Sequence, residues 1–176
     1  MNKRISWSVI IAAVGMTAIV WAHEMPIQKP GSKEFQQIKQ LTGNWMGVTT
    51  HPGTAQKPEP VSVEFQMTAA GSAIEEKLMK GTPHEMVDMY TDENGKLAMT
   101  HYCAMGNQPH MVLKQAGPNQ VSLEMASAPG VDAAKDAHMH ALTLEFPDAN
   151  HLTEKWTSYA NGKPAEQVVM EMARVK

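Results

Sequence analysis

This chain of 176 residues has one cysteine, few aromatic residues and no excess of positive charge. A single cysteine, Cys103, cannot form a disulfide within the chain or supply a zinc site built from several cysteines. Lys and Arg number 15 against 18 Asp and Glu, so the net charge is −3. Because nucleic-acid-binding proteins usually carry a basic face, we expect no nucleic-acid partner. The length favours one domain with a hydrophobic core.

One long apolar run lies at the N-terminus, from Ile5 to Val20, directly after two basic residues. It is followed by Trp21-Ala22, and Val20-Trp21-Ala22 resembles a signal-peptidase site, so residues 1–22 are predicted to be a signal peptide cleaved near Ala22. An uncleaved anchor is the alternative, but serine, threonine and glycine within the run weaken it as a membrane span. We therefore expect a periplasmic or secreted protein without stable membrane insertion after cleavage.

The pattern after the signal peptide predicts an extended leader, a short helix and one domain. Residues 23–33 contain two prolines and a glycine and show no periodicity. Ser32 is placed as the N-cap of a helix whose apolar residues recur at helical spacing, and Gly43 ends it. The domain is expected to span residues 34–176.

Beyond the helix, apolar and polar residues alternate with a period of two, which is typical of half-buried antiparallel strands. The clearest segments are residues 61–67, 72–80, 97–105, 121–125, 138–146, 151–159 and 168–172. Turn sequences separate them, including Asn94-Gly95 and Asn161-Gly162, the strongest type of hairpin signal. Residues 129–137 form one longer loop. About ten strands in a simple meander predict an all-β fold, an up-and-down antiparallel β-barrel that hides its edges by closure.

The segment Leu41-Thr42-Gly43-Asn44-Trp45-Met46-Gly47 resembles the Gly-x-Trp signature that opens the first strand of lipocalin-like (calycin) barrels. In that superfamily a short helix precedes the strand, and a basic residue on the last strand stacks on the tryptophan. Arg174 is the one arginine after residue 22. The resemblance therefore implies that Arg174 lies over Trp45 and closes one end of the barrel.

Three further stretches resemble a group of uncharacterised exported bacterial proteins known as domain of unknown function 1579, or DUF1579. They are residues 81–86, residues 100–109 and His138-Met139-His140. The resemblance would cover nearly the whole chain after the leader, and it implies an exported barrel without assigning an activity. Nitrobindin barrels, which bind heme, are more distant relatives by architecture, but no matching heme-ligand motif is present.

Strand alternation places two pairs of candidate site residues on shared faces. His101 and Cys103 are two residues apart, as are His138 and His140, and apolar neighbours suggest that both pairs point into the barrel. If the two strands face each other, these four side chains could bind Cu(I) or Zn(II), which accept imidazole and thiolate ligands. The alternative is structural, because buried histidines and cysteines often only complete hydrogen bonds in a core.

Other candidate sites have weaker support in the sequence. His51, His84 and His151 lie beside prolines or turns and are expected at the rim or surface. His23 would be the mature N-terminus and could chelate copper, but the leader and the few aromatic residues argue against that site. The 13 methionines after residue 22 outnumber the 8 leucines but are dispersed, so core packing explains them better than copper handling.

The leading functional hypothesis is a binding barrel that holds a small apolar or amphipathic ligand, with an enzyme as the alternative. The ligand-binding residues would be His101, Cys103, His138, His140, Glu76 and Glu154. An enzyme, a hydrolase or isomerase, would use a His/Glu acid–base pair in the same cavity, although no Gly-x-Ser-x-Gly elbow is present. We do not expect His101 and Cys103 to form a catalytic dyad, because strand neighbours at this spacing lie about 7 Å apart. A structural barrel filled by its own side chains is a third possibility.

Overall fold

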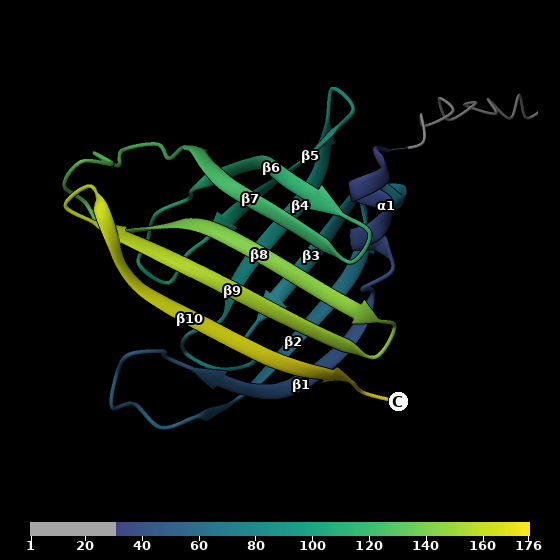
Figure 1. The fold of residues 1–176 in the computed structure, drawn as a ribbon. Helices are drawn as coiled ribbons and strands as arrows, with labels where there is room; N and C mark the ends of the chain where they lie inside the picture. The colour runs from purple at the N-terminus through teal and green to yellow at the C-terminus, as the bar shows by residue number, and fades with distance from the viewer. Residues whose placement is uncertain (1–30) are drawn as a thin grey trace, which may run out of the picture.

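The chain folds into a closed barrel of ten antiparallel strands in which each strand pairs with its neighbours in sequence and β1 pairs with β10 (Figure 1). The computed structural model describes residues 31–176. The elements are α1 (Lys33–Lys39), β1 (Gly43–Thr50), β2 (Glu59–Thr68), a 3-10 turn (Ala69–Gly71), β3 (Ala73–Leu78), β4 (Met86–Glu93), β5 (Lys96–Tyr102), β6 (His110–Gly117), β7 (Gln120–Ser127), β8 (His138–Asp148), β9 (His151–Ala160) and β10 (Lys163–Arg174). The predicted fold class, an up-and-down barrel with a short N-terminal helix, is confirmed.

Helix α1 covers one end of the barrel, which we call the floor. Ser32 caps the helix as predicted, its side chain accepting a hydrogen bond from the Phe35 N–H at 3.2 Å. Phe35 and Ile38 are buried in the core, and the helix packs against β4 and β5. The Gln37 amide donates to the carbonyls of Gly117 and Pro118, which ties α1 to the β6–β7 turn at the same end.

Arg174 and Trp45 complete the floor as the lipocalin-like resemblance implied. The guanidinium carbon lies 4.3 Å from the Trp45 ring centroid, and the guanidinium donates to the carbonyls of Gln40, Thr42 and Ala149. It therefore satisfies backbone acceptors at the end of α1 while stacking on a fully buried indole. Gly47 is needed beside this site, because a Cβ there would lie 1.9 Å from the Glu171 carbonyl oxygen on β10.

The Asn-Gly turns have the backbone geometry that the sequence predicts. Asn94 and Gly95 both have positive φ values of 55° and 82°, and Asn161 and Gly162 have values of 53° and 69°. Positive φ at both central residues is the requirement of a type I′ turn, whose twist suits a two-residue hairpin. Each turn therefore joins its two strands, β4 to β5 and β9 to β10, with the shortest connection.

Two details of the predicted strands are wrong. The strand expected over residues 97–105 ends at Tyr102, because Cys103 and Gly106 close a turn with a hydrogen bond from the Gly106 N–H to the Cys103 carbonyl. Met105 lies in that turn and is 48% exposed. Met67, near the end of β2, is also half exposed. Neither methionine lines the barrel.

Several sequence-based expectations concern residues 1–30, outside the described part of the chain. These are the signal peptide of residues 1–22, its cleavage near Ala22, most of the leader of residues 23–33, and a copper site at His23. In residues 31–176, no helix combines the length and apolar character needed to cross a membrane.

Replacing Arg174 by lysine should destabilise the barrel by about 1–3 kcal/mol, because an ammonium cannot stack flat on Trp45 while donating to three carbonyls. Urea unfolding followed by circular dichroism would measure the loss. The control is Lys163→Arg at the exposed start of the same strand, which we expect to change stability by less than about 0.5 kcal/mol. Equal effects of the two substitutions would contradict the role given to Arg174.

Candidate functional site

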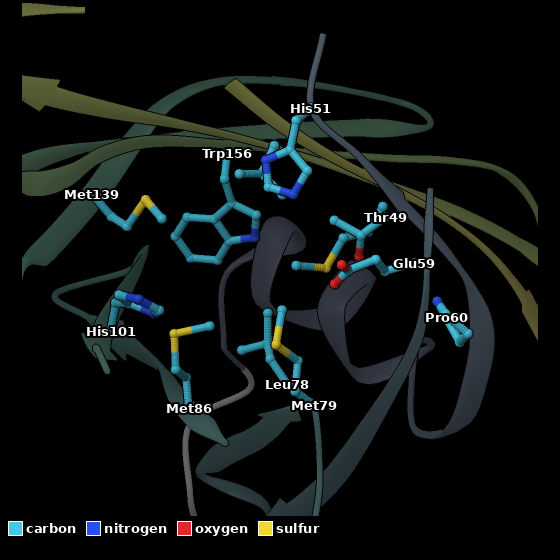
Figure 2. Close-up of a pocket in the computed structure, with 12 residues that line it drawn as sticks. Thr49, His51, Glu59, Pro60, Leu78, Met79, Met86, His101, Met139 and Trp156 are labelled. Carbon is cyan, nitrogen blue, oxygen red and sulfur yellow. The ribbon is translucent and has the colours of Figure 1, made fainter. Parts of the chain in front are cut away.

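A cavity of about 150 Å³ lies at the end of the barrel opposite α1, which we call the mouth (Figure 2). The strands that end here and contribute to the cavity are β1, β3, β5 and β9, and those that begin here are β2, β4, β8 and β10. Most of the lining side chains are apolar, with a few polar groups among them. The lining residues are Thr49, His51, Glu59, Pro60, Leu78, Met79, Met86, His101, Met139, Trp156, Val168 and Met170.

His101 is the one candidate from the sequence that lines this cavity directly. It is 1% exposed, and its Nδ1 atom lies 2.5 Å from Oδ1 of Asp88 on the neighbouring strand β4. Burial alone would lower the pKa of the imidazole, but the Asp88 carboxylate outweighs it and raises the pKa of His101 to about 10. His101 is therefore an imidazolium at neutral pH, with an N–H at each ring nitrogen.

The second ring nitrogen of His101, Nε2, is the one that Asp88 does not bind. Nε2 is buried and has no hydrogen-bond partner in residues 31–176. Figure 2 shows the ring directed from the barrel wall toward the space flanked by Met86 and Met139. The Trp156 indole packs beside the ring, with centroids 4.7 Å apart and planes tilted by 43°. Nε2 thus has no hydrogen-bond partner at bonding distance among the described residues, although the Cys103 thiol is close enough to influence the pKa of His101.

A row of polar side chains extends from His101 across the inner face of three adjacent strands. His101 on β5 is the register partner of Asp88 on β4, and Asp88 is the partner of Glu76 on β3. All three side chains are buried. Tyr90 donates a 2.7 Å hydrogen bond from its hydroxyl to Glu76 Oε2. Register, rather than spacing within one strand, brings these groups together.

Glu76 also meets Glu154, which reaches into the lumen from β9 on the far side of the barrel. Both carboxyl groups are buried, each influences the pKa of the other, and Oε1 of each has no hydrogen-bond partner among the described residues. Burial, followed by the charges of Glu154 and Asp88, raises the pKa of Glu76 well above its usual value. Burial also raises the pKa of Glu154 to about 7. One proton is therefore retained between the two groups at neutral pH.

The carboxyl pair lies one layer beneath the cavity. Leu78 and Trp156 each come two residues nearer the mouth than Glu76 and Glu154 on the same strands, and both line the cavity. The Trp156 indole donates a 3.1 Å hydrogen bond from Nε1 to Glu154 Oε2. Glu76 and Glu154 therefore point inward, as the alternation indicated, but neither is among the residues that line the cavity. They lie directly beneath the side chains that form the bottom of the cavity.

Cys103 is half-buried just beyond the end of β5, beside His101. Burial raises the pKa of its thiol, but interaction with His101 and with the Met105 N–H outweighs burial and lowers the pKa overall. The turn after Tyr102 takes Cys103 out of the strand and leaves its thiol where it interacts with His101.

His138 and His140 form a separate pair at the mouth end of β8. His138 is buried, with Nδ1 2.9 Å from the Asp136 carbonyl and Nε2 3.2 Å from Nδ1 of His140. His140 stacks on Tyr159 at 3.8 Å between centroids, and partial burial together with His138 lowers its pKa. Met139, between them, lines the cavity. These histidines therefore border the site without lining it.

The histidines proposed as metal ligands do not converge on one point. In residues 31–176, no group of three or more His, Cys, Asp or Glu side chains is arranged to hold a metal ion. Six of the seven histidines in this range lie at the mouth, and His151 lies at the floor. His84 and His151 are exposed, and His51 lies at the rim of the cavity, where Glu166 is 2.7 Å from its Nδ1.

Several residues of the cavity lining and of the polar row beside it were missed by the sequence reasoning. Asp88 and Tyr90 share a face of β4, and the alternation over residues 86–93 could have shown this. Trp156 follows Glu154 at a spacing of two, so the same signal was available there. Thr49, Met79 and Met86 carry no distinguishing pattern, because their role depends on which strand ends meet at the mouth.

Comparison with solved structures finds proteins of similar fold. The crystal structure of Rv2717c from M. tuberculosis matches with a TM-score of 0.59 and 16% identity, covering 84% of this chain and all of that chain. A protein of unknown function from the DUF3598 family of Nostoc punctiforme matches with a TM-score of 0.55 and 15% identity, covering 79% of this chain and 49% of that chain. No protein-family model and no curated protein matches the sequence. At these identities the likeness shows the fold alone: this is a ten-stranded barrel that is similar in structure to both proteins.

The stability of the barrel should fall as pH rises, because the buried groups Glu76, Glu154 and His101 have raised pKa values and take up protons on folding. The pKa of Glu154 is raised from 4.5 to about 7, so its contribution is present below pH 4.5 and is lost by about pH 7. The pKa of His101 is raised from 6.5 to about 10, so its contribution is lost between those values. Urea unfolding at pH 5, 6, 7, 8 and 9 would measure the decline.

Glu154→Gln should reduce the decline in unfolding free energy between pH 5 and 7. At pH 8 the variant should be more stable than the parent by on the order of 2 kcal/mol. Glu75→Gln, on the outer face of β3, is the matched control and should leave the profile unchanged. Parallel profiles for the parent and Glu154→Gln would show that Glu154 does not carry this proton.

Proposed function

We propose that this protein is an exported binding protein that holds a small apolar or amphipathic ligand in the mouth cavity. The observation that carries the proposal is the cavity itself: an apolar pocket at the open end of a β-barrel, with a small number of buried polar groups in its wall. A barrel that served only as a filled structural element would gain stability by closing this space, since unfilled volume costs packing energy. The mouth of a barrel is also a common place for ligand sites.

The size of the cavity limits the ligand. A volume of about 150 Å³ is below the roughly 300–1,000 Å³ of pockets that take drug-sized molecules. An apolar cavity of roughly 150 Å³ in another protein binds benzene. The buried part of the ligand is therefore about the size of one aromatic ring, and any longer part would extend through the mouth.

An enzyme that uses a His/Glu acid–base pair has less support. With its pKa raised to about 10, His101 holds its proton too firmly to exchange it efficiently near neutral pH. Glu154 has a suitable pKa of about 7. However, Leu78 and Trp156 form the bottom of the cavity and separate Glu154 from it. Binding is the better account of these groups.

Metal binding at His101, Cys103, His138 and His140 also remains a hypothesis with limited support. A metal ligand must be an uncharged imidazole, whereas Asp88 keeps His101 protonated. His138 already uses both ring nitrogens, toward Asp136 and His140. Loading with copper or zinc followed by metal analysis would test the hypothesis, and one bound ion per chain would support it.

Membership of the DUF1579 group and export are parts of the same proposal. Their support is the sequence: the stretches at residues 81–86, 100–109 and 138–140 for the group, and residues 1–22 for export. Residues 81–86 lie in the β3–β4 connection at the mouth, and residues 138–140 begin β8 at the same end. Residues 100–109 include the end of β5 and the connection to β6. The resemblance therefore falls on the elements that surround the cavity.

Filling the cavity should abolish binding without unfolding the barrel. Val168→Phe would place a ring in the pocket from β10, and we expect it to weaken binding of a benzene-sized probe, ethylbenzene, at least tenfold at a stability cost of about 1–3 kcal/mol. Binding can be followed by NMR of methyl-labelled methionine, since Met79, Met86, Met139 and Met170 line the cavity.

The matched control is Val112→Phe, the same change on the exposed outer face of β6. It should bind ethylbenzene like the parent. The exposed methionines Met46, Met67 and Met105 serve as internal references, because binding in the cavity should leave their signals unchanged. If neither ethylbenzene nor an aromatic probe of similar size that carries a polar group shifts a cavity methionine in the parent at millimolar concentration, the proposed function is wrong.

A further inference from the structure

We infer that the ligand is an uncharged molecule with an aromatic or similarly compact apolar body and one carbonyl-type acceptor, which takes the Nε2–H of His101. The inference rests on the proposed function and specifies the chemical class of the ligand. It follows from three properties of the site: an unsatisfied donor, the balance of charge around it, and the chemistry of the walls.

The donor is already positioned and desolvated. Asp88 holds Nδ1 at 2.5 Å and Trp156 packs on the ring, so His101 cannot turn away from the cavity. Nε2 is buried without a partner among the described residues. A buried donor left unpaired costs about 1–3 kcal/mol, and a ligand acceptor would recover this. Met86 and Met139 flank the ring, and rotation of their flexible side chains would open Nε2 to the ligand.

The surrounding charges exclude charged ligands. The groups that face His101 are Asp88, Cys103 and Trp156, with the Glu154 carboxyl in the layer below. Asp88 already neutralises the imidazolium, so an anion would meet the negative charges of Asp88 and Glu154 without a free cation to pair with. Glu59 adds a further carboxylate to the lining. A cation would lose its hydration in the apolar cavity and would bring no acceptor for the Nε2–H of His101. A neutral acceptor avoids both penalties.

The walls favour an aromatic body. Met79, Met86, Met139 and Met170 surround the space together with Trp156. Thioether sulfur atoms interact favourably with aromatic rings, and the indole offers a further aromatic contact. The volume of about 150 Å³ accommodates one ring with a short substituent. Small aryl ketones and aldehydes combine this body with a carbonyl oxygen.

Four probes of similar size separate the possibilities: acetophenone (neutral acceptor), ethylbenzene (no acceptor), benzoate (anion) and benzylamine (cation). Titration of each into the parent protein at pH 7.5, followed by methionine methyl NMR and calorimetry, gives the affinities. We expect acetophenone to bind at least tenfold more tightly than ethylbenzene, in line with one hydrogen bond to a charged donor. Benzoate and benzylamine should bind more weakly than acetophenone.

The variant that tests the donor replaces both members of the buried pair, His101→Phe with Asp88→Leu, because removing His101 alone would leave Asp88 buried and unpaired. It should bind ethylbenzene and acetophenone equally. A measurement on the parent protein is independent of this variant: the ¹⁵N and ¹H shifts of the His101 Nε2–H should move on adding acetophenone and stay unchanged with ethylbenzene.

The outcomes distinguish the two proposals. If ethylbenzene binds in the cavity as tightly as acetophenone, or benzoate binds more tightly, the inferred ligand class is wrong and the binding function stands. If acetophenone binds preferentially but the His101 Nε2–H signal does not respond, His101 is not the donor and the inference is wrong. If none of the four probes shifts a cavity methionine, the binding function fails as well.

Discussion

The state of the mouth cavity depends on the ion pair between Asp88 and His101. An isolated imidazole at this depth would lose its charge, since burial favours the neutral ring. Asp88, 2.5 Å away on the adjacent strand, reverses that preference and orients the ring through Nδ1. The consequence is a fixed, charged N–H at a cavity wall that is otherwise largely apolar. The ring held in this way packs beside Trp156 and interacts with the Cys103 thiol.

The polar residues beneath the cavity reduce the stability of the barrel. Two buried carboxyl groups, Glu76 and Glu154, meet across the lumen and keep a proton between them, and apolar residues of similar size would pack there without loss of hydration. Toward the floor, the lumen is filled by apolar side chains such as Phe65, Leu97 and Met99. Polar groups are thus concentrated directly beneath the cavity. Such a local departure from the rules of core packing is typical of a functional site, where stability is given up for chemistry.

The sequence alone predicts much of the architecture and part of the site. Period-two alternation and Asn-Gly turns are local signals, so they predict the strands, the hairpins and the inward direction of His101, Glu76 and Glu154. Contacts between strands are different, because they depend on register and closure. The pairing of Asp88 with His101 requires the β4–β5 register, and the meeting of Glu76 with Glu154 requires that β3 and β9 face each other. Alternation also fails where a strand ends early, as at Tyr102, which is why Met105 was misplaced.

The two ends of the barrel are built for different tasks. At the floor, Arg174 binds three backbone carbonyls and stacks on Trp45, and α1 seals the opening, so this end is fixed. At the mouth, four methionines line the cavity, and each can change conformation at little cost because its side chain is unbranched. A ligand of the class proposed above would therefore enter from the mouth, where flexible side chains could adjust to its body while the His101 ring stays in place. A rigid polar group within an adaptable apolar wall would select ligands by the position of an acceptor more strictly than by their shape.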